Sequence, residues 1–420
     1  MLNLLQVEIF LISKYLNVHE YHRVRLAFRN NLKLIPTLYF SAYQDSALAV
    51  KDPSEYMILD SNAIQEHFEY IVKQGHLHQT RVSIHSIPED QLKSLFQYLQ
   101  QSQSLEMLLL FCEYYLEFGI TSKSLYLNVF HKAIEVGNIN LVERMLEDIP
   151  PSEGYLFAIS NGNLEILDLF VQHGLDLTLN SNVAIRRACY FGHLEMVKYL
   201  LDHNVDPSCF RNDAFRQACH QGHLQIVKLL LQDDRVNPTV LKHEGLRKAA
   251  EYGHADIVEL LLPLCDPRVM HNEPIRFACE YGHLETAKIL LKDDRVDPGD
   301  MDNYAIKKAS HNGYSSVVEL LLQQKLVNPT VNTNEPFRLA CKAGHANVVS
   351  LFLKDNRINP GCNSNYGIRI ASENGHFEIV ELLLKDGRCN PNANNNYAIR
   401  HAQKKKFTKV VQLLQTAHEK

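Results

Sequence analysis

Cysteine and histidine stand close together at one place in the sequence, with a spacing that could hold a metal ion. Cys219 and His220 are adjacent, and His223 follows three residues later. A structural zinc site needs four ligands that converge on one ion. Here the same residue types return one at a time, every 29 to 31 residues, so Cys219 and His223 belong to columns of equivalent positions. We therefore predict no metal site and no cofactor.

The histidine column follows a glycine in six copies of the pattern. A histidine titrates nearest to neutral pH, so the column could sense pH. It could instead hydrogen-bond the free backbone groups at a turn between two helices. We favour the second interpretation, because the column follows the period closely: His193, His223, His254, His283, His345 and His376.

A basic column offers a third kind of chemistry. Its guanidinium groups could bind an acidic or phosphorylated partner. They could instead pair internally, with the Asp or Asn before each repeat's proline or with a backbone carbonyl of a neighbouring repeat. We favour internal pairing for this column, which consists of Arg186, Arg216, Arg247, Arg276, Lys307, Arg338, Arg369 and Arg400.

Groupings that would indicate catalysis are absent from the sequence. It holds no Gly-Lys-Ser phosphate loop and no His-Glu-x-x-His motif. Its paired acids, such as Asp233 and Asp234, recur with the period. We predict no catalytic residues and no enzymatic activity.

A repeated pair of helices must position all these columns. Each repeat is named here after its glycine: Gly192, Gly222, Gly253, Gly282, Gly313, Gly344 and Gly375. In the Gly313 repeat, Asn303 is expected to cap a helix that ends at the glycine. A second apolar helix follows, and Pro329 prevents its continuation. Neither helix can bury its apolar face alone, so the repeats must stack.

The repeat resembles the ankyrin repeat. The segment Glu273-Pro274-Ile275-Arg276-Phe277-Ala278 is similar to the Thr-Pro-Leu-His-x-Ala that opens the first helix in that family, and residues 282–291 match its Gly-His-x-x-(Ile/Val)-Val-x-Leu-Leu-Leu. The resemblance covers Phe130 to Leu414. It implies an all-α ankyrin-type solenoid of helix-turn-helix repeats with short extended fingers, which acts as a protein-binding module or scaffold.

The repeats set the expected domain organisation. Residues 1–125 form a helical N-terminal region, 126–180 two degenerate repeats, 181–395 the seven clear repeats, and 396–420 a C-terminal capping repeat and tail. In this last repeat Lys406 replaces the glycine. The run Lys404 to Lys406 fits a solvated cap, and a nuclear localisation signal is the alternative.

The start of the chain resembles an F-box between residues 4 and 30. Leu5-Gln6-Val7-Glu8-Ile9 and Tyr15-Leu16 are similar to that family's Leu-Pro-x-Glu-Ile and Tyr-Leu, with Gln6 in place of the proline. The resemblance implies docking on the adaptor of a cullin-type ubiquitin ligase through Leu5, Ile9 and Leu16. An amphipathic capping helix is the alternative interpretation.

Positions that vary between repeats are the candidates for recognition. Aromatic residues precede the early glycines, and the third residue after each proline changes from apolar to Asn along the chain. Exposed aromatic and methionine side chains are enriched at interfaces. We predict that a protein partner, of unknown identity, binds the concave face and fingers of the first five repeats at Tyr190, Phe191, Phe210, His220, Leu241, Tyr252, Met270, Tyr281 and Met301.

Composition restricts the other function classes. A net charge of −5 over 420 residues gives no general basic field, so nucleic acid is not expected as a partner. No stretch approaches 18 uninterrupted apolar residues, which argues against a membrane. Four of the nine cysteines occupy one buried column, which suits a reducing compartment. We expect a cytoplasmic or nucleocytoplasmic monomer.

Overall fold

The computed structural model describes residues 123–418. The F-box hypothesis, with Leu5, Ile9 and Leu16, lies outside these residues. The chain divides into two compact bodies, Met1–Gly174 and Leu175–Lys420, and each is described by itself. All regular secondary structure in the described range is helical, which confirms the expected all-α class.

The described part of the first body contains the two degenerate repeats. Its rings Phe130 and Phe170 lie 6.0 Å apart in a core that also holds Tyr155. Two helix pairs pack around this core. Their elements are α8 (Lys123–Val136), α9 (Ile139–Met145), η2 (Pro151–Glu153), α10 (Tyr155–Ser160) and α11 (Leu164–Gln172).

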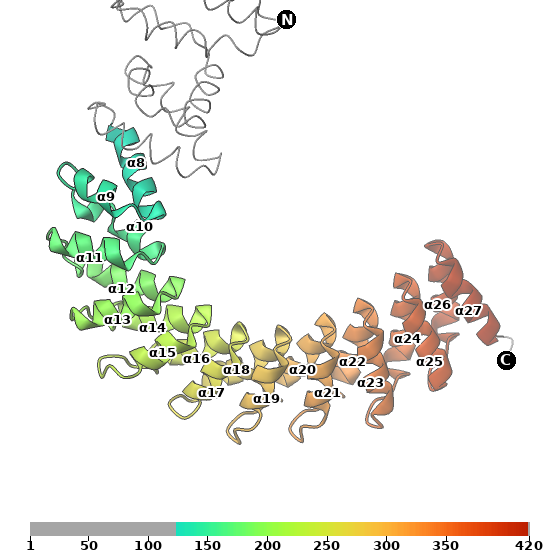
Figure 1. The fold of residues 1–420 in the computed structure, drawn as a ribbon. Helices are drawn as coiled ribbons and strands as arrows, with labels where there is room; N and C mark the ends of the chain where they lie inside the picture. The colour runs from blue at the N-terminus through green and yellow to red at the C-terminus, as the bar shows by residue number, and fades with distance from the viewer. Residues whose placement is uncertain (1–122, 419–420) are drawn as a thin grey trace, which may run out of the picture. The chain divides into compact units, whose positions relative to one another are not determined.

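The second body is a row of helix pairs. In Figure 1 the first helices lie along the inner side of this row and the second helices along its outer side. The first helices are α12 (Leu179–Phe191), α14 (Cys209–Gln221), α16 (Val240–Glu251), α18 (Val269–Glu280), α20 (Asp300–Asn312), α22 (Val331–Ala343), α24 (Cys362–Asn374) and α26 (Ala393–Lys404). The second helices are α13 (Leu194–Asp202), α15 (Leu224–Leu230), α17 (Ala255–Leu261), α19 (Leu284–Leu290), α21 (Ser315–Leu322), α23 (Ala346–Lys354), α25 (Phe377–Asp386) and α27 (Thr408–His418).

Apolar columns on both helices form a continuous core along this row. In the Gly313 repeat, Ile306 and Ala309 of α20 and Val318 and Leu321 of α21 are each 0% exposed. Full burial of one such branched side chain contributes about 1.5–3 kcal/mol. Because each repeat contributes the same positions, stacking buries an apolar face that no single pair could bury.

The finger between one helix pair and the next is a sequence of turns. The residue before the proline accepts a hydrogen bond from the backbone two residues on, as when Asn328 Oδ1 accepts from the N–H of Thr330 at 3.0 Å. Each first helix then begins with three consecutive residues that have left-handed dihedrals, for example Met301, Asp302 and Asn303 at the start of α20, with φ of 52°, 54° and 60°.

The predicted cap at Asn303 is wrong. Its Oδ1 accepts from the backbone N–H of Asn328, in the finger that follows, at 2.6 Å. Asn212, Asn272 and Asn365 do the same 25 residues ahead. The left-handed backbone turns this side chain away from its own helix, so the Asn joins two fingers instead of capping a helix.

None of the helices in the described range is long and apolar enough to cross a membrane.

Candidate functional site

The histidine column joins successive repeats. The Nε2 atom of His345 lies 2.8 Å from the backbone oxygen of His311, near the end of the preceding first helix. His223, His254, His283 and His376 make the equivalent contact. The prediction of hydrogen bonding at the inter-helix turn is confirmed, with the acceptor supplied by the repeat before.

The glycine column leaves space for these histidines. Gly313 has φ +82°, and a Cβ atom there would stand 2.5 Å from Nδ1 of His345. The residue after a helix often takes this left-handed conformation. Each such glycine therefore allows the left-handed turn within its own repeat and leaves room for the histidine ring of the next repeat.

The basic column is paired internally, as favoured above. Arg276 donates from Nε to the carbonyl of His271 at 2.7 Å and from Nη2 to that of Met270 at 2.8 Å. These carbonyls belong to the left-handed turn of the same repeat. Arg216, Arg247, Arg338 and Arg369 donate to the two equivalent carbonyls.

The basic column also contacts the next repeat. Arg247 pairs with Glu273 at 2.7 Å, and the guanidinium of Arg276 lies 5.0 Å from the ring centre of Tyr304. The expected partner, the Asp or Asn before each proline, is instead held within its own finger, as when Asp297 Oδ1 accepts from the N–H of Gly299 at 2.8 Å. The guanidinium groups are thus committed to carbonyls, acids and rings of the array.

The cysteine and histidine spacing that suggested a metal has another explanation. Cys219 is fully buried, and burial raises the pKa of its thiol. Burial also lowers the pKa of His220, whose ring lies 4.3 Å from that of Tyr252. Within residues 123–418 no group of three or more His, Cys, Asp or Glu residues could hold an ion.

The nine predicted binding residues lie in two rows. Tyr190, Phe191, His220, Tyr252 and Tyr281 stand where the first helices end, and we call them the helix-end row. Phe210, Leu241, Met270 and Met301 stand in the left-handed turns where those helices begin, and we call them the fingertip row. About nine helical residues, or roughly 14 Å, separate the rows.

The helix-end row presents aromatic rings to solvent. Tyr190, Tyr252 and Tyr281 are 44%, 48% and 48% exposed. The rings of Tyr190 and Phe191 meet edge to face at 5.0 Å. Rigid amphipathic rings of this kind supply large contact areas at interfaces.

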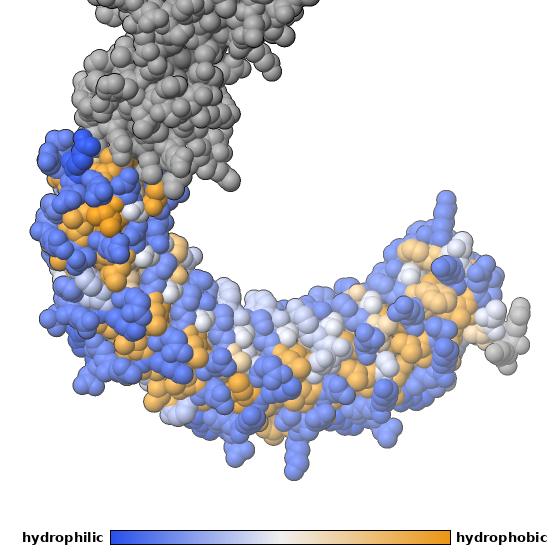
Figure 2. All heavy atoms as spheres, viewed as in Figure 1, coloured by the Kyte–Doolittle hydropathy of each residue, from blue (hydrophilic) through white to orange (hydrophobic). Residues whose placement is uncertain are grey.

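The fingertip row is equally open. Phe210, Met270 and Met301 are 58%, 42% and 49% exposed, and Leu241 is half-buried. The guanidinium of Arg186 lies 4.4 Å from the ring centre of Phe210, and Nζ of Lys242 lies 3.5 Å from Sδ of Met270. In the view of Figure 2, hydrophobic residues alternate with hydrophilic ones along the second body.

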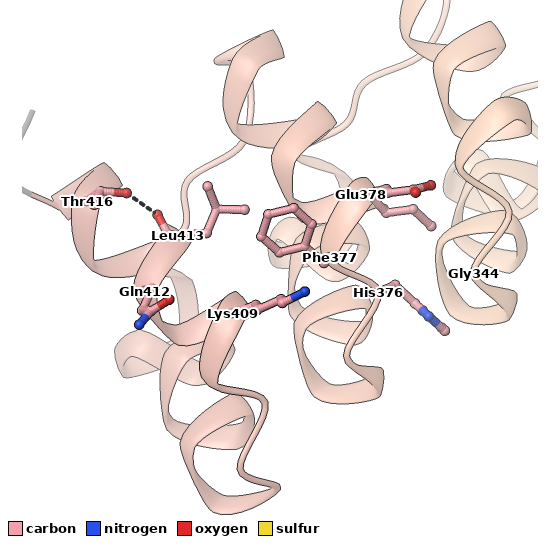
Figure 3. Close-up of a pocket in the computed structure, with 9 residues that line it drawn as sticks. Gly344, His376, Phe377, Glu378, Lys409, Gln412, Leu413 and Thr416 are labelled. Atoms are coloured by element: carbon pink, nitrogen blue, oxygen red, sulfur yellow. Dashed lines mark hydrogen bonds between the residues drawn. The ribbon is translucent and has the colours of Figure 1, made fainter.

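An open groove that the sequence did not predict lies between α25 and α27. Phe377, which is 37% exposed, and Leu413 lie on its opposite sides, with Lys409 and Gln412 at its edge (Figure 3). One feature of the sequence could have indicated this groove. The second residue after the glycine is Leu, Ala or Ser in the six preceding clear repeats, whereas it is Phe377 in this one.

Comparison with known proteins identifies the repeat through a family model. A family model described as ankyrin repeats (3 copies) matches six overlapping segments, 155–242, 216–302, 246–335, 276–366, 305–395 and 337–419. Among solved structures, the human ASB11 ankyrin repeat domain is similar, with 19% identity, a TM-score of 0.33, and coverage of 43% of this chain and 95% of that one. The comparison with curated proteins finds no match.

Proposed function

Because the chain belongs to the ankyrin repeat family, we propose that it is a non-enzymatic module or scaffold that binds a protein partner through the helix-end and fingertip rows. Repeat arrays bind through extended surfaces, and specificity lies in a few variable positions. The two rows occupy such positions in the Gly192 to Gly313 repeats.

One observation carries this proposal. The residues that recur in every repeat bond to other residues of the array, whereas the variable residues of the helix-end and fingertip rows are exposed to solvent. Arg276 is 8% exposed and bonded to two carbonyls, while Tyr281, in the same helix pair, is 48% exposed. Tyr190, Tyr252 and Tyr281 are 44%, 48% and 48% exposed, so their rings are accessible to a partner.

The test is affinity purification with the full chain, followed by mass spectrometry. Tyr190→Ala, Tyr252→Ala and Tyr281→Ala together should remove the captured partner, because truncation of clustered interface aromatics costs about 2 kcal/mol or more at each hot spot. The control removes two other exposed apolar side chains, Leu326→Ala and Phe377→Ala. If the tyrosine variant folds and retains the same partner, the site is wrong.

A second candidate is the substrate receptor of a cullin-type ubiquitin ligase. The F-box-like motif at Leu5, Ile9 and Leu16 favours it, with the repeats holding the target. Co-purification with a cullin adaptor, lost in the Leu5→Asp and Ile9→Asp variant, would support this function. Absence of the adaptor from purifications of the unmodified chain would exclude it.

A further inference from the structure

The fingertip row occupies a backbone conformation that large side chains avoid. The first residue of each left-handed turn in the second body has φ between 49° and 56°. Asn tolerates this region, whereas a bulky residue there is uncommon and costs stability. Four consecutive repeats nevertheless use large apolar residues, flanked on both sides by Asn, in the order Asn180, Phe210, Leu241, Met270, Met301, Asn332, Asn363 and Asn394.

The fold does not require these large side chains. Arg276 donates to the carbonyl of Met270 at 2.8 Å, and Arg338 donates to the carbonyl of Asn332 at the same distance. The structural role therefore belongs to the backbone, and Asn fulfils it equally. Residues held in sparsely populated backbone conformations cluster at functional sites.

Basic residues accompany the apolar residues. The next residue in three of these turns is Arg211, Lys242 or His271, each exposed. None of the three forms an ion pair within the described residues, whereas Arg216 and Arg247 on the same first helices pair with acids. In the last three repeats the same position is uncharged, with Thr333, Ser364 and Asn395.

We propose that this strip, formed by the fingertip row with Arg211, Lys242 and His271, binds an extended acidic segment of a protein in which an apolar residue recurs at every third position. Neighbouring helices pack roughly 8–10 Å apart. An extended polyproline II chain advances about 3.1 Å per residue with three residues per turn, so every third side chain points to the same side. Three residues thus span one repeat. Carboxylates between the apolar residues pair with Arg211 and Lys242 and accept a hydrogen bond from His271. The inference rests on the proposed function and specifies its partner.

An anionic membrane is the competing occupant, because apolar and basic residues also bind lipid surfaces. Asp302 follows Met301 in the fourth turn, where a negative lipid surface would be repelled. An extended segment can place an uncharged residue there. The observations therefore favour the polypeptide.

The test measures fluorescence anisotropy of a labelled peptide with four Leu-Glu-Ser triplets, added to the full chain. The reference peptides replace Glu by Lys or Leu by Ser. If the strip is the binding site, the acidic peptide binds, and high salt lowers its affinity. Each reference peptide binds at least about tenfold more weakly. Absence of binding of the acidic peptide at about 1 mM protein would overturn the proposal.

Two variants make the test specific. Phe210→Asn, Leu241→Asn, Met270→Asn and Met301→Asn together introduce the residue that the chain itself uses in the flanking repeats, so folding is retained and affinity falls at least about tenfold. Arg211→Glu with Lys242→Glu reverses the preference toward the lysine peptide. Unchanged affinity in the first variant, unchanged preference in the second, or tighter binding to phosphatidylserine vesicles than to the peptide contradicts the proposal.

The outcome separates this inference from the proposed function. If the peptide fails but a partner is captured and then lost in the Tyr190, Tyr252 and Tyr281 variant, only the acidic-segment inference fails. If the captured partner is also insensitive to that variant, the proposed function fails with it.

Discussion

Gly313→Ala tests the contact between repeats most sharply. The alanine must keep φ near +82°, and its Cβ would stand 2.5 Å from Nδ1 of His345. The ring can move away only by giving up the contact between its Nε2 and the oxygen of His311, which is 2.8 Å long. The substitution therefore perturbs the turn and the contact with the next repeat together.

The expected loss is the sum of two effects. A left-handed conformation costs a non-glycine residue about 1–2 kcal/mol, and a lost hydrogen bond costs about 0.5–1.5 kcal/mol. Gly313→Ala should lower the free energy of unfolding by about 2–3 kcal/mol. Gly387→Ala is the matched control, because Gly387 has φ +77° with no atom within 4 Å of its Cβ position, so it should lose only about 1–2 kcal/mol.

Urea denaturation followed by circular dichroism measures both losses. Adding His345→Ala removes the obstructing ring, so in that background Gly313→Ala should cost no more than Gly387→Ala does in the unmodified chain. Such non-additivity is expected only for residues in contact. Equal losses for the two glycine variants, or strict additivity with His345→Ala, would refute the contact between repeats.

Three further predictions concern the fingers and the core. Arg295→Leu removes the bonds from this guanidinium to Asp293 and to the carbonyls of Leu262 and Cys265, and should lower the free energy of unfolding by about 1 kcal/mol in urea denaturation; no loss would show that these bonds are inconsequential. Hydrogen bonds from Arg268 lower the pKa of Asp266 to about 2, so the stabilisation is complete above the unfolded pKa near 4 and is lost as pH falls toward 2. Acid titration of Asp266→Asn should show a smaller loss over that window, and an identical profile would contradict the assignment. Burial raises the pKa of the Cys279 thiol, so iodoacetamide should label half-buried Cys209 before Cys279 in the folded chain; mass spectrometry showing equal rates would contradict this order.

The sequence predicted the helix pairs, the glycine turns and the histidine contacts, because each depends on a residue type that recurs with a fixed period. It did not predict the partner of Asn303. Three successive left-handed residues carry no strong signal, since Phe210 and Met270 normally avoid that conformation. Local capping was therefore the simpler expectation. The N–H group that actually donates to Asn303 belongs to Asn328, in the next finger.

The arginine column and the binding rows show a second limit. Internal pairing of Arg276 followed from its regular recurrence, but its acceptors lie in a turn whose shape the sequence does not reveal. Likewise Tyr281 and Met270 both break the repeat pattern and were grouped together. The sequence placed one before a glycine and the other after a proline, and the structure adds that both side chains are exposed.

Hydrogen–deuterium exchange of the chain, alone and with its affinity-purified partner, tests the central claim most directly. The account predicts slower exchange at the helix ends around Tyr190, Tyr252 and Tyr281 and in the turns around Phe210 and Met270, where bound partner excludes water. It predicts no change along the second helices α13, α15, α17 and α19, which lie on the outer side. Protection confined to those outer helices, or to the Gly344 and Gly375 repeats, would contradict it.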